Sequence, residues 1–261
     1  MPIDTFEKAI RSLQVFFPGL VDLKAEVRYQ LQHTLRVPHE ADFSALSNFR
    51  PQPDEMLVDV GANRGQSIES ILIHQPKANI VAFEPNPCLW PCLKRRYDHR
   101  SNIQIHLMGL SDNEEFLELF VPVYRGFVFD GLASVEYAEA YSWLNDERIY
   151  GFSARHLKIE KYKAQLVRLD TLQLRPAFIK IDVQDLELKV VKGGLETIRK
   201  HLPVLLIESV GPTHPISVLL RELGYHCYAF RGGKLHPNER GSLNSFLINP
   251  SISRFGPELF A

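Results

Sequence analysis

Apolar side chains near the start of the chain recur every three or four positions, which is the spacing of one face of an α-helix. The residues in this pattern are Phe6, Ile10, Leu13 and Phe17, followed by Leu23, Val27, Leu31 and Leu35. Pro18–Gly19 separates the two sets, and a polar segment with two prolines follows over residues 49–55. The pattern predicts two helices and a polar linker.

From residue 56 onward, short apolar runs alternate with stretches of helical periodicity. The predicted strands are Met56–Val60, Ile80–Phe83, Ile103–Leu107, Phe178–Val183, Val204–Ile207, Cys227–Phe230 and Ser245–Ile248. The predicted helices are 66–74, 88–97, 186–202 and 216–223. This alternation indicates an α/β fold with a mostly parallel sheet and helices on both faces. We expect the last strand to close the sheet in an antiparallel hairpin.

One long interruption separates the two halves of this pattern. Residues Phe116–Pro122 and Gln165–Leu172 alternate like strands and enclose an irregular segment. Residues 123–163 hold nine of the 27 aromatic residues of the chain. Disordered segments contain few aromatic residues, so we expect this segment to be folded. Two interpretations stay open, a packed subdomain that covers the sheet and a lid over the substrate.

The composition narrows the class of protein. Of 261 residues, 45% are apolar and 23% are charged, which excludes disordered and fibrous proteins. The net charge of -1 argues against nucleic-acid binding, and the lack of a long apolar run predicts that nothing spans a membrane. The three cysteines cannot pair completely and no signal peptide is evident, so we expect free thiols and a cytoplasmic location.

The most informative motif is Asp59–Gly65 (DVGANRG), where the first predicted strand turns into the first predicted helix. Open parallel sheets bind ligands at the carboxyl ends of their strands. Gly61 permits a tight turn and leaves room for a ligand against the backbone. The following helix offers free N–H groups at its start. The motif therefore predicts a cofactor site.

Two cofactors compete for this site. A dinucleotide needs the pattern GxGxxG, and counting from Gly61 the second and third glycines are replaced by Asn63 and Gln66. S-adenosylmethionine (SAM) has no pyrophosphate and needs fewer glycines. Glu84, at the end of the second predicted strand, is placed to accept the ribose hydroxyls of either cofactor. The glycine pattern favours SAM over NAD.

Five segments occur in a fixed order: DVGANRG at 59–65, FEPNP at 83–87, GLSD at 109–112, RLDTL at 168–172 and FIKIDVQDLELKVVKGG at 178–194. Together they resemble the FkbM family of SAM-dependent methyltransferases, over about residues 56–250. The resemblance implies a class I methyltransferase fold, a Rossmann-like seven-stranded sheet with an antiparallel last strand. It also implies O-methylation of a sugar or of a secondary metabolite.

The resemblance also implies a set of cofactor contacts. The residues assigned to SAM by position are Asp59, Gly61, Asn63, Gly65, Glu84, Asn86, Ser111 and Asp112. Gly61, Asn63 and Gly65 would hold the methionine part, and Glu84 would take the ribose hydroxyls. Asn86 would contact either the ribose or the adenine, and Ser111 and Asp112, after the third strand, the adenine. We expect Asp59 to fix the turn or to receive the SAM ammonium through water. Asp112 fits a turn or a helix cap equally well.

One departure from the family pattern lies beside the predicted reaction centre. The family commonly has Glu-Gly where this chain has Gln184–Asp185. The loss of a carboxylate and a glycine there either alters the substrate or marks a weak or inactive enzyme. Both interpretations stay open.

Methyl transfer to a hydroxyl needs a group that removes its proton. Lys180 and Asp182 lie two apart on a predicted strand and hence on one face of the sheet, where burial is costly unless the charges pair or act. We predict Asp182 as the base or orienting group, with Lys180 beside it and Glu208 at the end of the next strand. The alternative for Lys180 and Asp182 is a structural ion pair, and the alternative for Glu208 is a carboxylate that caps the following turn. Together with Asp182 and Glu208, the carboxylates of Asp185 and Glu187 could supply oxygen ligands to a divalent metal ion. The spacing of these residues does not require a metal, and none is predicted.

The sequence thus predicts a methyltransferase domain over residues 56–250 with an insertion at 123–163, a helical extension over 1–55 and a tail over 251–261. The expected acceptor is a small hydroxylated molecule between the strand ends and the insertion. The N-terminal helices are expected to cap the sheet, to mediate homodimerisation or simply to pack on the core. A SAM-binding module without catalysis and an NAD-dependent oxidoreductase are the alternatives.

Overall fold

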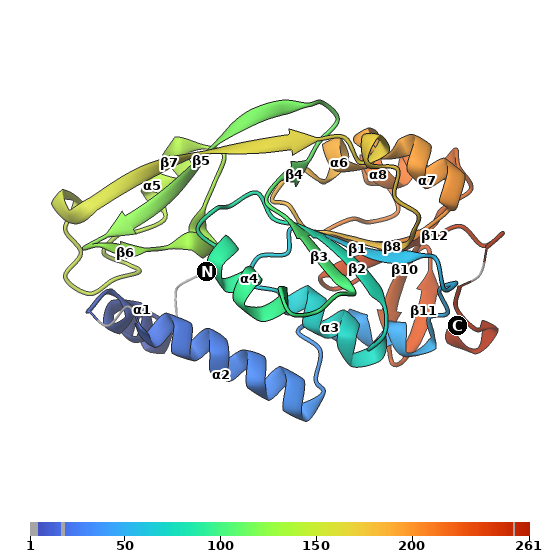
Figure 1. Ribbon diagram of the computed structural model, residues 1–261, viewed down its shortest axis with the longest axis horizontal. Helices are drawn as coiled ribbons and strands as arrows, with labels where there is room; N and C mark the ends of the chain where they lie inside the picture. Colours follow the sequence, from blue (N-terminus) through green and yellow to red (C-terminus); the bar gives the residue numbers. More distant parts are fainter. Residues whose placement is uncertain (1–4, 17–18, 253) are drawn as a thin grey trace.

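The computed structural model describes residues 5–16, 19–252 and 254–261, which form two β-sheets with surrounding helices (Figure 1). The larger sheet has the strand order β11-β10-β12-β9-β8-β1-β2-β3. Its strands are β1 (Met56–Val60), β2 (Asn79–Phe83), β3 (Ile103–His106), β8 (Pro176–Ile181), β9 (Val204–Glu208), β10 (His226–Arg231), β11 (Lys234–Pro237) and β12 (Asn244–Ile248). The neighbours from β3 through β2, β1 and β8 to β9 pair in parallel.

The predicted α/β architecture is confirmed, but the number of strands differs. Within the described residues the larger sheet has eight strands rather than the seven that the resemblance implies. The strand missed by the sequence analysis is β11, which pairs antiparallel with β10 across Gly232–Gly233. Both glycines have positive φ angles, 57° and 77°, which tight hairpin turns require. Strand β12 runs antiparallel to β9 and β10, as predicted for the last strand, so the sheet is mixed.

Helices cover both faces of the larger sheet (Figure 1). One face carries α3 (Gln66–His74) and α4 (Trp90–Tyr97). The other face carries α6 (Glu187–Gly193), α7 (Leu195–His201) and α8 (Pro215–Arg221). The single helix predicted over 186–202 is divided at Gly194, where a side chain would press on Leu169.

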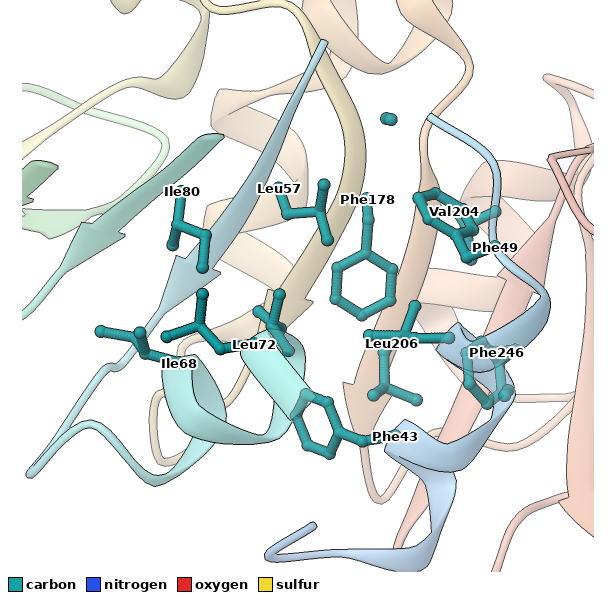
Figure 2. Close-up of a cluster of buried hydrophobic side chains, with 14 of the residues drawn as sticks. Phe43, Phe49, Leu57, Ile68, Leu72, Ile80, Phe178, Val204, Leu206 and Phe246 are labelled. Atoms are coloured by element: carbon teal, nitrogen blue, oxygen red, sulfur yellow. The ribbon is translucent and has the colours of Figure 1, made fainter. Parts of the chain in front are cut away.

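A core of apolar side chains fills the α3 face of the larger sheet (Figure 2). Phe178 and Leu206 project into it from the central strands and meet Phe43 and Phe49. Phe43 belongs to the 3-10 helix η1 (Ala41–Asn48) and is fully buried, and Phe49 is also buried. The predicted linker over residues 49–55 has neither a helix nor a strand, but its first residue, Phe49, is not solvent-exposed because its ring packs on that of Phe178.

The segment between β3 and β8 forms the second sheet, with the order β4-β7-β5-β6. Its strands are β4 (Gly109–Leu110), β5 (Glu115–Tyr124), β6 (Phe127–Val128) and β7 (Leu157–Val167). The predicted strand over 165–172 is wrong in its second half, because residues 169–172 form the 3-10 helix η4 (Leu169–Leu172). Strand β7 begins at Leu157, inside the segment predicted as irregular.

Aromatic side chains of the stretch 123–163 pack into a core of their own. Tyr124, Phe127 and Phe129 belong to it, together with Leu144 and Ile149. The remaining elements of this stretch are η2 (Asp130–Leu132), α5 (Tyr137–Ser142) and η3 (Ala154–His156). This packing supports the interpretation of a folded subdomain, which we call the insertion.

The first helix, α1 (Thr5–Phe16), packs against the insertion rather than on the larger sheet. Val15 belongs to the core of the insertion, and the Oγ of Ser12 accepts a hydrogen bond from the N–H of Tyr150 at 2.9 Å. The guanidinium of Arg11 lies over the ring of Trp143. Phe17 and the predicted helix break at Pro18 lie outside the described residues.

The second helix, α2 (Gly19–Leu35), lies beside α3 and α4 (Figure 1). Its Gln32 hydrogen-bonds Ser70 of α3 at 2.9 Å. Of the four apolar residues predicted to line one face, Val27, Leu31 and Leu35 instead point to solvent and are 48%, 53% and 64% exposed. The side chain of the fourth, Leu23, lies outside the described part of the structure. Homodimerisation through these helices stays a prediction. No helix among the described residues has the length and apolar character needed to cross a membrane.

Candidate active site

The register of the larger sheet brings polar side chains onto one of its faces, near the carboxyl ends of the parallel strands. Alternate residues of a strand face opposite sides, and Asp59 of β1 faces the side that carries α3 and η1. Lys180 of β8 lies directly beside Asp59, and Glu208 of β9 lies directly beside Asn244 of β12. The four side chains therefore share one face of four adjacent strands.

The turn between β1 and α3 contains three residues with positive φ, namely Gly61 at 91°, Asn63 at 49° and Gly65 at 89°. Glycine adopts this conformation freely, and asparagine tolerates it. A Cβ atom at Gly61 would overlap the carbonyl oxygen of Asp182, and one at Gly65 would overlap the hydroxyl of Tyr97. In the sequence alone, the approach of a ligand is the expected reason for a glycine at position 61. The structure adds that the main chain at the end of β8 itself requires this glycine.

Asp59 is fully buried behind this turn, and its two carboxylate oxygens differ. The Oδ2 atom accepts a hydrogen bond from the Oγ of Ser67 at 2.5 Å, whereas no described residue donates one to Oδ1. Burial raises the pKa of Asp59 to about 7, although Ser67 and Lys180 act in the opposite direction. A buried carboxylate oxygen without a donor fits the ammonium group of an amino-acid ligand, which only donates.

Glu84 follows β2 and faces the same turn. Its Oε2 atom accepts from the N–H of Asn63 at 2.7 Å, and its Oε1 atom accepts from the N–H of Asn86 at 2.9 Å. Burial raises the pKa of Glu84, and these two hydrogen bonds oppose the rise. Because each carboxylate oxygen has a second lone pair, Glu84 holds the turn and keeps acceptor sites that fit a ribose diol.

The predicted adenine contacts, Ser111 and Asp112, follow β4 of the second sheet rather than β3. Ser111 is fully buried, and its Oγ donates to Oδ1 of Asp112 at 3.3 Å. Its carbonyl packs where a side chain on Gly193 would lie. Gly109 packs against Pro85 and so places this segment beside the residues that follow β2. Of the pair, Asp112 alone keeps part of its surface accessible.

The ends of β8 and β9 bring Lys180, Asp182 and Glu208 together. The Nζ atom of Lys180, which is 2% exposed, lies 3.5 Å from Oδ2 of Asp182. The side chain of Asp182 hydrogen-bonds that of Glu208. This hydrogen bond, together with burial and the charge of Asp182, raises the pKa of Glu208 to about 7. Two carboxyl groups in such contact cannot easily both be ionised, so the pKa of one of them rises.

Sequence reasoning missed a second set of groups that bind Lys180. Its Nζ donates to Oδ1 of Asn244 at 2.8 Å. The Nδ2 of Asn244 in turn donates to Oε2 of Glu40 at 2.7 Å and to Oδ2 of Asp42 at 3.0 Å. Asn244 and Asp42 are both buried. The one available signal is the polar Asn244 at the start of an apolar strand.

Asp130 of the insertion was also missed, and it lies against the glycine turn. Its carboxylate pairs with Arg64 at 2.5 Å, and its carbonyl oxygen accepts from Nδ2 of Asn86 at 3.0 Å. The insertion is therefore tied both to the turn after β1 and to the segment after β2. Nothing in the sequence around Asp130 signals this contact.

The Gln184–Asp185 departure falls on two left-handed residues, with φ of 51° and 68°. Glycine suits this conformation best, which gives the family's usual glycine a physical reason, and aspartate tolerates it. Glu187 accepts a hydrogen bond from the N–H of Val183 at 3.1 Å and so acts on the backbone of the same turn. Among the described residues, no group of three or more His, Cys, Asp or Glu side chains is placed to hold a metal ion.

Comparison with known protein families gives a match over residues 59–227, to a family model described as the methyltransferase FkbM domain. The chain is 28% identical over 234 residues to the AMB antimetabolite synthetase AmbE of Pseudomonas aeruginosa. That alignment covers 69% of this chain and 11% of the synthetase. The chain therefore corresponds to a small part of the length of this curated relative.

Among solved structures, the methyltransferase FkbM of Methylobacillus flagellatus is 19% identical, with a TM-score of 0.47 over 77% of this chain and 47% of that chain. A precorrin-6y C5,15-methyltransferase of Geobacter metallireducens is 14% identical, with a TM-score of 0.37 over 78% of this chain and 83% of that one. A fibrillarin/Nop5p complex is 14% identical, with a TM-score of 0.38, and covers 82% of this chain and 83% of that chain.

Proposed function

Because the chain belongs to the FkbM methyltransferase family, we propose that it is a SAM-dependent methyltransferase that methylates a hydroxyl group of a small molecule. SAM, when bound, supplies a methyl group on a positively charged sulfur, which an acceptor oxygen displaces in line. The acceptor class is a sugar or a hydroxylated secondary metabolite. The chain's own residues would hold the cofactor, orient the acceptor and remove one proton.

The cofactor assignment is supported by the donors and acceptors around the glycine turn. The free Oδ1 of Asp59 fits an ammonium group, and the lone pairs of Glu84 fit a ribose diol. Asn86 and Asp112 extend this row of polar groups toward the second sheet. SAM has no pyrophosphate and therefore does not need a cluster of basic side chains at its site.

The observation that carries the proposal is the hydrogen-bonded pair Asp182–Glu208 beside the glycine turn. Since Gly61 packs on the main chain of Asp182, the turn and the carboxyl pair are neighbours. A base acts most efficiently when its pKa lies near the working pH, and the pKa of Glu208 is raised to about 7. As the methyl group bonds to the acceptor oxygen, the hydroxyl proton passes to the carboxylate of this pair.

The acceptor would lie against the insertion, which contacts the turn through Asp130 and Arg64. The groups at the strand ends are mainly acidic, so they favour a neutral or cationic hydroxylated molecule. The phosphates of a nucleic acid would be repelled. Catalysis in the cytoplasm fits the three free cysteines, Cys88, Cys92 and Cys227.

Transfer of radiolabelled methyl groups from SAM to a panel of sugars and hydroxylated metabolites tests the proposal. The Asp182→Asn variant should keep its affinity for SAM and lose turnover by about 10²- to 10⁴-fold, as expected for loss of a general base. Asp98→Asn, at an exposed acid just after α4, is the control and should retain turnover. Full turnover in Asp182→Asn would refute the assigned base. SAM binding without transfer to any acceptor would indicate a non-catalytic module.

A further inference from the structure

The side chains that surround Lys180 come from parts of the chain that lie far apart in the sequence. Asn244 belongs to β12, and Glu40 directly precedes η1. The hydrogen bonds from Asn244 to Glu40 and to Asp42 span 204 and 202 positions. All three residues lie outside the range 59–227 that matches the family model, so the family match assigns them no role.

We propose that Glu40, Asp42 and Asn244 form a positioning relay that fixes the Lys180 ammonium against Asp182 and thereby tunes the proton affinity of the Asp182–Glu208 pair. This inference rests on the proposed function for its catalytic meaning. The relay itself is a property of the folded chain and is measurable without an acceptor.

The hydrogen-bonding chemistry of the relay fixes the orientation of each member. A carboxylate only accepts and an ammonium only donates, whereas an amide side chain does both. The amino group of Asn244 must face Glu40 and Asp42, because both are acceptors, so its carbonyl oxygen faces Lys180. Neither aspartate nor leucine at position 244 can bridge the carboxylates to the ammonium.

The distances place Lys180 between two acids that compete for it. Its Nζ lies 3.5 Å from Asp182 and 3.9 Å from Glu40. The lysine is 2% exposed, so solvent screens these interactions only weakly. The hydrogen bond to Asn244, at 2.8 Å, holds the ammonium within ion-pair distance of both carboxylates.

The charges that face this group come from every element packed around it. Lys180 provides the positive charge from β8, and Asp182 and Glu208 form the pair. The other acidic groups are Asp59 on β1, Glu187 on α6, Glu40 just before η1 and Asp42 in the first turn of η1. One ammonium among several carboxyl groups leaves excess negative charge, which increases the proton affinity of the pair. Removing one acid from the relay should decrease that affinity.

The Glu40→Gln variant isolates this effect, because glutamine keeps an acceptor for Asn244 and loses only the charge. With ¹³C-labelled glutamate side chains, the carboxyl signal of Glu208 is identified by its loss in Glu208→Gln and then titrated with pH. We expect the midpoint of Glu208 to fall on the order of half a unit in Glu40→Gln. Glu118→Gln removes an exposed carboxylate of β5 as the matched control and should leave the midpoint unchanged.

Asp42→Asn is the second variant, should Glu40→Gln fail to fold, and it should also lower the midpoint. A midpoint that stays the same or rises in both folded variants would overturn the relay. SAM affinity, measured by calorimetry on the same variants, should equal that of the unmodified chain. If the midpoint falls but the unmodified chain does not bind SAM, the proposed function fails and the relay stands. If SAM binds and the midpoint does not move, the relay fails alone.

Discussion

The glycine turn after β1 and the strand ends of β8 and β9 lie side by side, yet they organise their polar groups by different means. At the turn, the carboxylate of Glu84 is bound by backbone N–H groups. At the strand ends, Asp182, Glu208 and Lys180 are bound by one another. Backbone N–H groups keep their state at every pH, whereas side-chain charges depend on each other. The first region is thus suited to hold a ligand and the second to exchange a proton.

The largest effect is expected at Gly61, where the two regions touch. In Gly61→Ala, a methyl group must avoid the carbonyl of Asp182 while the backbone keeps a φ of 91°. We expect a loss of at least about 3 kcal/mol in the free energy of unfolding, measured with urea, together with loss of SAM binding.

Gly126→Ala is the matched control for this change. Its φ is 82° and no atom lies near the added methyl group. Only the left-handed strain remains, so a loss of about 1 kcal/mol is expected. Equal losses in the two variants would show that the turn does not press on β8.

Replacing Glu84 tests whether the turn holds the ligand. Glu84→Ala removes the acceptor of two backbone N–H groups and of the proposed ribose contact. SAM affinity measured by calorimetry should fall by about 1 to 3 kcal/mol, as is typical for a buried hydrogen-bonding group. Glu84→Gln keeps one acceptor oxygen, so its SAM affinity should lie between those of the unmodified chain and of Glu84→Ala. Unchanged affinity in Glu84→Ala would remove this residue from the cofactor site.

The pH dependence of stability tests the raised pKa of Glu208 in the proton-exchanging region. The pKa of Glu208 is raised from its ordinary value of 4.5 to about 7 in the folded chain. Between these values the folded chain keeps a proton that the unfolded chain releases, so the free energy of unfolding should decrease as the pH rises from 4.5 to 7. Asp59, with its pKa also raised to about 7, adds a decrease of the same sign.

Urea unfolding at about pH 5 and about pH 8 checks this dependence. The Glu208→Gln variant should show a smaller decrease than the unmodified chain, because one of the carboxyl groups with a raised pKa is gone. A decrease of the same size in both proteins would mean that Glu208 does not hold the extra proton.

The smallest effect is expected at the contact between the insertion and the turn. Asp130→Asn keeps the shape of the side chain and removes the charge that pairs with Arg64. A partly exposed ion pair contributes about 0.5 to 1 kcal/mol, so bound SAM should dissociate a few times faster in stopped-flow displacement. Asp146→Asn, another acid of the insertion, is the control. A slower dissociation in Asp130→Asn would contradict a restraining role of this contact.

Local patterns predicted the central part of the fold well. The strand Met56–Val60 and the helix Gln66–His74 have the predicted bounds, because an apolar run, a glycine turn and helical periodicity all lie within a few residues. The pairing of Lys180 with Asp182 follows from strand alternation in the same way. Glu84 faces the turn, as its place after β2 implies.

Contacts between distant parts of the chain were beyond such patterns. Nothing local distinguishes Asp42 from a surface acid, and its bond to Asn244 exists only once η1 packs on the sheet. The apolar face of α2 shows the opposite error, since Leu31 has helical spacing but points to solvent. Periodicity identifies the helix, whereas the face it buries depends on the surface that receives it.

Calorimetric titration of the unmodified chain with SAM, S-adenosylhomocysteine and NAD tests the central claim most directly. The structure of the turn predicts that both adenosyl sulfur compounds bind at one site per chain and that NAD does not. SAM should bind more tightly as the pH rises through about 7, because its ammonium favours the ionised form of Asp59. Binding of NAD, or no binding of either sulfur compound, would contradict a methyl-donor site between Gly61 and Glu84.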